Sequence, residues 1–160
     1  MTLDAVRVTT PVGPLTVVVD ASGAVLASGF CEPADLVALF DLPPVVVRRR
    51  IPVVSEALRA WLAGDTAALA AVPVGLEGPE FTRGVWSALQ AVPPGRTVTY
   101  GELAADAGRP AAARAAGSAC AHNRVAPFVP CHRAVPASGG LGRYAYGTDV
   151  KAWLLLHERH

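Results

Sequence analysis

The chain has 160 residues, of which 52% are hydrophobic and 17% charged, a composition typical of a folded globular protein and not of a disordered segment. No apolar run approaches the roughly 20 residues that a membrane-spanning helix needs, and the first residues lack the basic start and apolar core of a secretory signal. Because three cysteines are too few for a disulfide framework, we expect a cytoplasmic protein with reduced thiols and no membrane partner.

Charge is distributed unevenly along the chain, although the net charge is only +1. Residues 1–78 carry five arginines against eight acidic residues, a net charge of −3, whereas residues 79–160 carry eight arginines and one lysine against five acidic residues, a net charge of +4. A basic second half favours a polyanionic partner such as nucleic acid, although a chance surface imbalance would give the same count. Gly75, Gly78 and Pro79 cluster where the charge changes, which predicts one domain over residues 1–78 and a second over residues 79–160.

The first half predicts a small α/β domain with an antiparallel sheet and helix. β-Branched residues are dense from Val6 to Phe30 and are interrupted by turn signals, which predicts two or three strands. A short helix is expected over Glu32–Phe40, ended by the Pro43-Pro44 pair, and an amphipathic helix over Val54–Gly64. The segment Thr66–Glu80 is expected to be a connection with one more strand.

The second half predicts a helical domain, so the whole chain is assigned to the α+β class. Apolar residues recur at helical spacing over Pro79–Val92. Thr99 and Glu102 form a capping-box pattern that opens a short helix, and a second helix is expected to start at Pro110. These two helices make a helix-turn-helix candidate, and a final helix is expected from Thr148 to the chain end.

Arg114 stands alone among small residues in the segment Ala111–Gly117. Small neighbours let a helix approach another surface closely, and an arginine on such a helix can probe a groove or fill the space left by a displaced base. An arginine that only keeps a solvent-facing helix soluble would give the same pattern. The residues alone leave both interpretations open.

The segment Arg124–Val135, RVAPFVPCHRAV, is an apolar run that ends at a Pro-Cys-His-Arg tetrapeptide. A thiol after such a run is often buried and inert. Zinc is a second interpretation, since four soft ligands lie close in sequence: Cys120, His122, Cys131 and His132. Their spacings do not match a paired C-x-x-C knuckle. In a third interpretation Cys131 is a nucleophile, which His132 deprotonates while a carboxylate such as Glu158 orients the histidine.

Four segments together resemble the O6-alkylguanine-DNA alkyltransferase family: VTYGELA, AAARAAGSA, NRVAPFVPCHR and GGLGRYAYGTDVKAWLLLHE. The resemblance covers Phe81–Glu158 and, more weakly, the opening segment TPVGPLTVVVDASGAVLASGF. It implies DNA repair by irreversible, single-turnover transfer of the alkyl group, mainly methyl, from O6-alkylguanine in duplex DNA to Cys131. Minor-groove binding and base flipping would precede the transfer, and no cofactor or metal is implied.

The resemblance also implies roles for individual residues. Cys131 would accept the alkyl group, His132 would act as general base through a water, and Glu158 would polarise His132. Asn123 would tie the helix-turn-helix to the active-site loop, and Tyr100 would donate its hydroxyl toward the departing guanine. Arg114 would fill the space of the flipped nucleotide. The remaining implied DNA-binding residues are Ala112, Ala113, Ala115, Gly117 and Arg124, and the implied pocket residues are Tyr144, Ala145, Tyr146, Ala134 and Lys151.

The chain departs from the family pattern at four of these positions. Arg124 stands where proline is usual, Ala134 replaces a common valine, and Ala145 replaces a serine found in many members. Tyr146 stands where many members have glycine, so we expect a narrow pocket that accepts methyl well and benzyl poorly.

Two other functions remain open at this point. A non-transferring damage sensor of this fold would lack the reactive cysteine, and a transcription factor would use the helix-turn-helix alone. For the transferase we expect a monomer on double-stranded DNA, with O4-alkylthymine as a further candidate substrate and cooperative DNA binding left open.

Overall fold

The structure is a computed structural model that describes residues 2–159, and it divides into two compact units. The first unit comprises residues 1–75 together with Arg124–Phe128, and the second comprises Leu76–Asn123 and residues 129–160. The predicted division of the chain after Gly78 did not anticipate that Arg124–Phe128 belongs to the first unit. None of the helices among residues 2–159 is long and apolar enough to cross a membrane.

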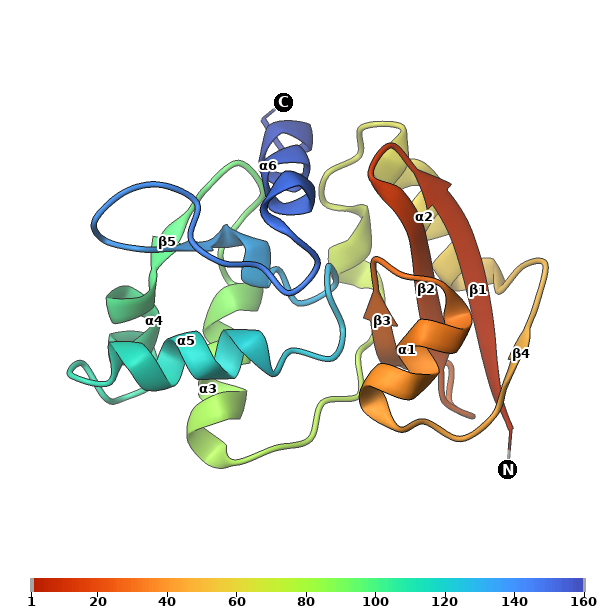
Figure 1. The fold of residues 1–160 in the computed structure, drawn as a ribbon, viewed down its shortest axis with the longest axis horizontal. Coiled ribbons are helices and arrows are strands. Elements are labelled where there is room, and N and C mark those ends of the chain that lie inside the picture. The colour runs from red at the N-terminus through yellow and green to blue at the C-terminus, as the bar shows by residue number, and fades with distance from the viewer. Residues whose placement is uncertain (1, 160) are drawn as a thin grey trace. The chain divides into compact units, whose positions relative to one another are not determined.

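The first unit is built on a four-stranded sheet in the order β3-β2-β1-β4 (Figure 1). Strands β1 (Leu3–Thr10), β2 (Gly13–Val19) and β3 (Val25–Gly29) pair antiparallel, and β4 (Val45–Val47) pairs parallel to β1. Helix α1 (Pro33–Phe40) packs Leu36 against sheet residues to form the core of this unit: Leu3, Ala5, Val18 and Ala27. The antiparallel sheet with a helix is therefore confirmed, and the short parallel strand β4 was not predicted.

Two expectations for the first unit need correction. Helix α2 (Pro52–Leu62) begins two residues earlier than expected, because Pro52 fits the first helical turn. The strand expected within Thr66–Glu80 is absent: this part of the chain forms the short 3₁₀ helix η1 (Ala68–Ala71) and a single bridge between Val74 and Val25. The Pro73 carbonyl accepts from the Val25 N–H at 2.9 Å, but Pro73 has no N–H with which to extend a ladder.

The second unit is mainly helical. Its elements are α3 (Glu80–Gln90), β5 (Val98–Thr99), α4 (Tyr100–Asp106), α5 (Ala113–Ala121), η2 (Cys131–Arg133), β6 (Ala134–Val135) and α6 (Thr148–His157). The indole N–H of Trp86 on α3 donates to the carbonyl of Ala119 on α5 at 2.9 Å. On the other side of α3, Gly84 allows close approach of Ala107, whose Cβ would lie 3.2 Å from a Cβ added at Gly84. Helix α3 is thus the support of the α4–α5 pair.

Helix α4 begins where the sequence predicted, whereas helix α5 begins later than predicted. The Thr99 hydroxyl accepts from the Glu102 N–H at 3.1 Å, and the Glu102 carboxylate accepts from the Thr99 N–H at 2.9 Å, so the predicted capping box is confirmed. Helix α5 begins at Ala113 and not at Pro110, because the Ala112 N–H closes a turn onto the Arg109 carbonyl at 2.9 Å.

Candidate active site

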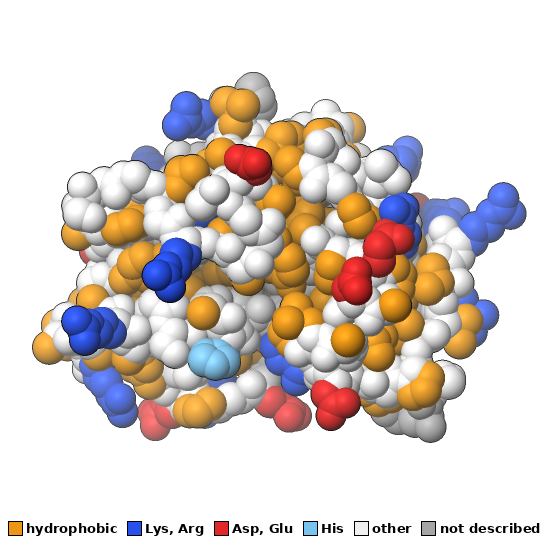
Figure 2. All heavy atoms as spheres, viewed as in Figure 1, with side chains coloured by type: hydrophobic (Ala, Val, Ile, Leu, Met, Phe, Trp, Pro, Cys, Tyr) orange, Lys and Arg blue, Asp and Glu red, His pale blue; other side chains and the backbone are white. Residues whose placement is uncertain are grey.

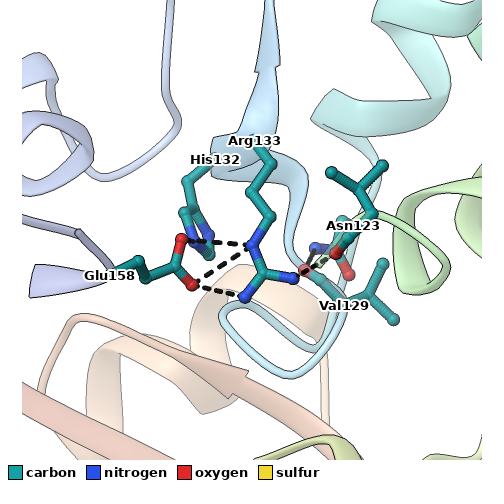
Figure 3. Close-up of polar contacts among 6 residues, drawn as sticks. Asn123, Val129, His132, Arg133 and Glu158 are labelled. Atoms are coloured by element: carbon teal, nitrogen blue, oxygen red, sulfur yellow. Dashed lines mark hydrogen bonds and ion pairs between the residues drawn. The ribbon is translucent and has the colours of Figure 1, made fainter. Parts of the chain in front are cut away.

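The Cys131 thiol lies in the short turn η2, where only 9% of the residue is exposed. Asn123 follows the end of α5, and its side-chain amide donates to the Val129 carbonyl at 2.8 Å (Figure 3). The same amide donates to the Cys131 Sγ at 3.1 Å. The Asn123 backbone N–H donates to the Cys120 carbonyl at 3.2 Å. Asn123 therefore connects the last turn of α5 to the loop that presents the thiol.

His132 and Glu158 lie together in the interior of the second unit (Figure 3). The Nε2 atom of His132 is 2.9 Å from Oε1 of Glu158, although 26 residues separate the two in sequence. Nδ1 of His132 is also buried, and it has no hydrogen-bond partner among residues 2–159. One ring nitrogen is therefore held by the carboxylate and the other remains available for proton transfer.

Arg133 completes this group. Its Nε lies 3.1 Å from each carboxylate oxygen of Glu158, its Nη2 also donates to Oε2, and its Nη1 donates to the Val92 carbonyl after α3 at 2.6 Å. Sequence reasoning did not select Arg133 as a site residue. The available signal was its position in the Pro-Cys-His-Arg tetrapeptide, but the partner carboxylate 25 residues away could not be identified from spacing.

The protonation states follow from burial and these contacts. Burial acts to raise the pKa of Glu158, but the hydrogen bonds and charges of His132 and Arg133 outweigh it and lower that pKa to about 2. Burial lowers the pKa of His132, against the opposing effect of Glu158. At neutral pH the pair is therefore a carboxylate and a neutral imidazole, which can accept a proton.

The Cys131 thiol needs such a base. Burial raises the pKa of Cys131, while the Asn123 hydrogen bond, the Lys151 charge and the Tyr144 hydroxyl act to lower it. A thiol with a raised pKa is protonated at neutral pH, so it becomes a nucleophile only when a neighbour accepts the proton.

Tyrosines from two segments lie near the thiol. Tyr100, at the start of α4, has a pKa raised by burial and by the negative charge that Cys120 and Cys131 would carry as thiolates. Tyr144 lies in the loop before α6, with a buried hydroxyl, and its ring meets the Tyr146 ring edge-on with centroids 5.8 Å apart. Ala145 between them is exposed.

The other residues implied to line the pocket are buried. Ala134 is completely buried in β6, where it pairs with Val98. Lys151, on α6, is also completely buried.

The residues implied to bind DNA lie mostly in the first half of α5 or directly before it. Ala113, Arg114 and Ala115 are exposed, and Ala112 and Gly117 are half-buried. The buried face of the helix carries Ala116, Ala119 and Cys120. In Figure 2 the surface over α4 and α5 carries separate basic side chains among uncharged atoms.

Arg124 belongs to the first unit. Its guanidinium donates to the Phe40 carbonyl at 2.9 Å and lies 5.0 Å from the centre of the Phe40 ring. A role of Arg124 in DNA binding stays a prediction.

The soft ligands that suggested zinc do not come together as a metal site. His122 directs Nδ1 to the Ser118 carbonyl at 2.7 Å, and His132 binds Glu158. Within residues 2–159 no group of three or more His, Cys, Asp or Glu side chains is arranged to hold a metal ion.

The sequence and the structure of the chain are similar to those of known proteins. Residues 80–160 match the family model described as 6-O-methylguanine DNA methyltransferase, DNA binding domain. The chain is 35% identical over 159 residues to a methylated-DNA–protein-cysteine methyltransferase of Shigella flexneri, with 95% of this chain and 93% of the relative covered. The chain belongs to the 6-O-methylguanine DNA methyltransferase family.

Further relatives agree with the assignment. A protein of the same name from Mycolicibacterium paratuberculosis is 48% identical over 104 residues, which span 65% of this chain and 62% of the relative. Among solved structures, the O6-methylguanine methyltransferase of Mycobacterium tuberculosis is similar with a TM-score of 0.79 and 32% identity, over 98% of this chain and 93% of that one. The family and the α+β fold predicted from the sequence are thereby confirmed.

Proposed function

We propose that this protein repairs DNA by moving the alkyl group, mainly methyl, of O6-alkylguanine in duplex DNA onto its own Cys131. The observation that carries the proposal is the buried Cys131 thiol, which Asn123 holds in the turn that also presents His132, whose imidazole meets the carboxylate of Glu158. Family relatives are methylated-DNA–protein-cysteine methyltransferases, and the Mycobacterium tuberculosis OGT has been crystallised in complex with DNA.

The chemistry is a single displacement at the alkyl carbon. His132 accepts the thiol proton through a water, the sulfur forms a bond to the alkyl carbon, and the carbon–O6 bond breaks. Guanine leaves as an anion, which the Tyr100 hydroxyl stabilises by donating a hydrogen bond. The guanine anion then takes up the proton that left the thiol. The product thioether is stable, so each protein molecule reacts once, and no cofactor is consumed.

The second unit supplies both the DNA-binding and the alkyl-acceptor parts. The small residues of α5 allow the helix to lie in the minor groove, and Arg114 fills the space of the flipped nucleotide. Minor-groove readout is degenerate, which suits repair at any sequence. The protein acts as a cytoplasmic monomer, and O4-alkylthymine is a second candidate substrate.

Intact-protein mass spectrometry after incubation with a duplex that carries one O6-methylguanine tests the proposal. We expect a gain of one methyl group, lost in Cys131→Ser and retained in the matched control Cys31→Ser. Binding of the duplex without any gain of mass would instead identify a damage sensor and contradict the transferase.

A further inference from the structure

Lys151 is the only lysine of the chain, and it is completely buried. Its ammonium group donates to the carbonyl of Ala134 in β6 at 2.7 Å and to the carbonyl of Arg143 at 3.4 Å. Ala134 follows the Cys131–Arg133 turn, and Arg143 directly precedes Tyr144. Lys151 therefore connects two segments that both border the acceptor thiol.

The burial of Lys151 calls for a physical reason, because a buried charge is unfavourable unless it is paired. Within the described part of the chain no carboxylate forms an ion pair with Lys151. The two carbonyl groups satisfy two of its three donors but carry no charge to balance the ammonium. Burial accordingly lowers the pKa of Lys151, and only the negative charge of Cys131 and Cys120 opposes this effect.

The ionisable groups that interact with the charge of Lys151 are Cys131 and His132 in η2 and Cys120 in α5. Tyr100 in α4 and Tyr144 in the loop before α6 lie close to Cys131, and the Glu158–Arg133 ion pair contacts His132. Glu158 is already bound by His132 and Arg133. Of the remaining groups only the cysteines become anions at moderately alkaline pH, and Cys120 is a poor candidate because burial raises its pKa to about 12.

We propose that Lys151 is a positioning residue of the transfer reaction, which ties the loop carrying Tyr144 to the strand after Cys131 and favours the thiolate of Cys131 over the thiol. This role rests on the alkyl transfer proposed above. The buried ammonium has no carboxylate partner within residues 2–159 and is held between the two segments by the carbonyls of Ala134 and Arg143, so its charge acts on the thiolate that forms when His132 accepts the proton.

The pH dependence of Cys131 alkylation tests the electrostatic part. Iodoacetamide reacts with the thiolate, and peptide mapping by mass spectrometry separates Cys131 from Cys31 and Cys120. We expect the midpoint of the pH profile for Cys131 alkylation to lie about one pH unit higher in Lys151→Met than in the wild type. At pH 7.5 this corresponds to alkylation about tenfold slower. Lys151→Arg, which keeps the charge, should retain the wild-type profile, and Cys31 should react equally in all three proteins. Superimposable Cys131 profiles for wild type and Lys151→Met would overturn the proposal.

A measurement on the wild-type protein avoids any folding defect of the variants. Because the chain has one lysine, protein labelled with ¹⁵N at the lysine Nζ gives a single lysine side-chain signal. Methylation of Cys131 with methyl iodide removes the negative charge of the thiolate, which acts to raise the pKa of Lys151. The midpoint of the Nζ titration should therefore move to lower pH. An unchanged Nζ titration would overturn the proposal. Since neither reagent is DNA, absence of methyl transfer from O6-methylguanine together with the expected iodoacetamide profile would reject only the proposed function.

Discussion

Arg133 and Glu158 form a two-pronged ion pair, in which the guanidinium meets both carboxylate oxygens and one of those oxygens also meets Nε2 of His132. The carboxylate is thereby fixed in one orientation, and the histidine is fixed by the carboxylate. Arg133 is itself held by the carbonyl of Val92, at the end of the helical support of the site. The orientation of His132, the proposed general base, thus depends on a chain of contacts that ends outside the active-site loop.

Glu158 should make the stability of the protein fall in acid. Its pKa is about 2 in the folded protein and has its ordinary value of 4.5 in the unfolded chain, so the unfolded state binds the proton first as the pH falls. The stabilisation is complete above pH 4.5 and is lost between pH 4.5 and 2, with a size on the order of 3 kcal/mol.

Urea unfolding at pH 7, 4 and 3 measures this loss. Glu158→Gln should be less stable than the wild type at pH 7 and should depend less on pH below 4.5. Glu56→Gln is the matched control, because Glu56 pairs with Arg50 at the exposed surface and should leave the dependence unchanged. Equal pH slopes in wild type and Glu158→Gln would contradict the prediction.

Asn123→Ala should slow the reaction of Cys131 with alkylating reagents. The amide hydrogen bond lowers the pKa of Cys131 and holds the loop through Val129, so its loss both raises the thiol pKa and loosens the loop. A rate about tenfold lower at pH 7.5 is expected with iodoacetamide, equivalent to one pKa unit. Ser118→Ala, on the exposed side of α5, is the control, and equal rates in the two variants would argue against this role of Asn123.

Tyr146→Gly should widen the range of alkyl groups. The Tyr146 ring meets Tyr144 edge-on, and the buried Tyr144 hydroxyl interacts with the Cys131 thiol, so removal of the Tyr146 ring should widen the proposed alkyl pocket. We expect at least about a tenfold faster reaction with O6-benzylguanine and little change with O6-methylguanine. Tyr146→Phe keeps the ring and should behave as the wild type. Comparable wild-type rates on the two bases would show that Tyr146 does not restrict the pocket.

Arg114→Ala should impair repair of duplex DNA while the free base still reacts. Arg114 is exposed on α5 and takes no part in the proposed transfer chemistry, so its loss should remove only the proposed wedge that offsets the cost of base flipping. Single-turnover rates on an O6-methylguanine duplex and on free O6-methylguanine separate the two effects, with a drop of about tenfold expected on the duplex alone. Arg59→Ala, exposed on α2, serves as the charge-matched control. An equal drop on both substrates would show that Arg114 is not the wedge.

Local patterns in the sequence were sufficient for much of the fold and part of the site. The Thr99–Glu102 capping box, the helical spacing of α3 and the antiparallel strands follow from neighbours a few residues apart, where propensity and periodicity act directly. The Pro-Cys-His-Arg tetrapeptide in its sequence context identified Cys131 and His132 as a candidate pair. The sequence pattern gave a wrong helix start at Pro110. Proline is favoured in the first turn of a helix, but the hydrogen bond from the Ala112 N–H to the Arg109 carbonyl forms a turn here, and α5 begins only at Ala113.

Only the tertiary structure decided which side chains meet. The contact of His132 with Glu158 and the link between Asn123 and Cys131, both expected from the family resemblance, and the ion pair of Arg133, which was not predicted, join residues 8 to 26 positions apart. Hydrophobic periodicity predicts which face of a helix or strand is buried, but it does not predict which other helix or strand packs against that face. Lys151 shows this clearly: the family resemblance implies that it lies near the pocket, but only the packing of α6 shows that its ammonium is buried and donates to the carbonyls of Ala134 and Arg143.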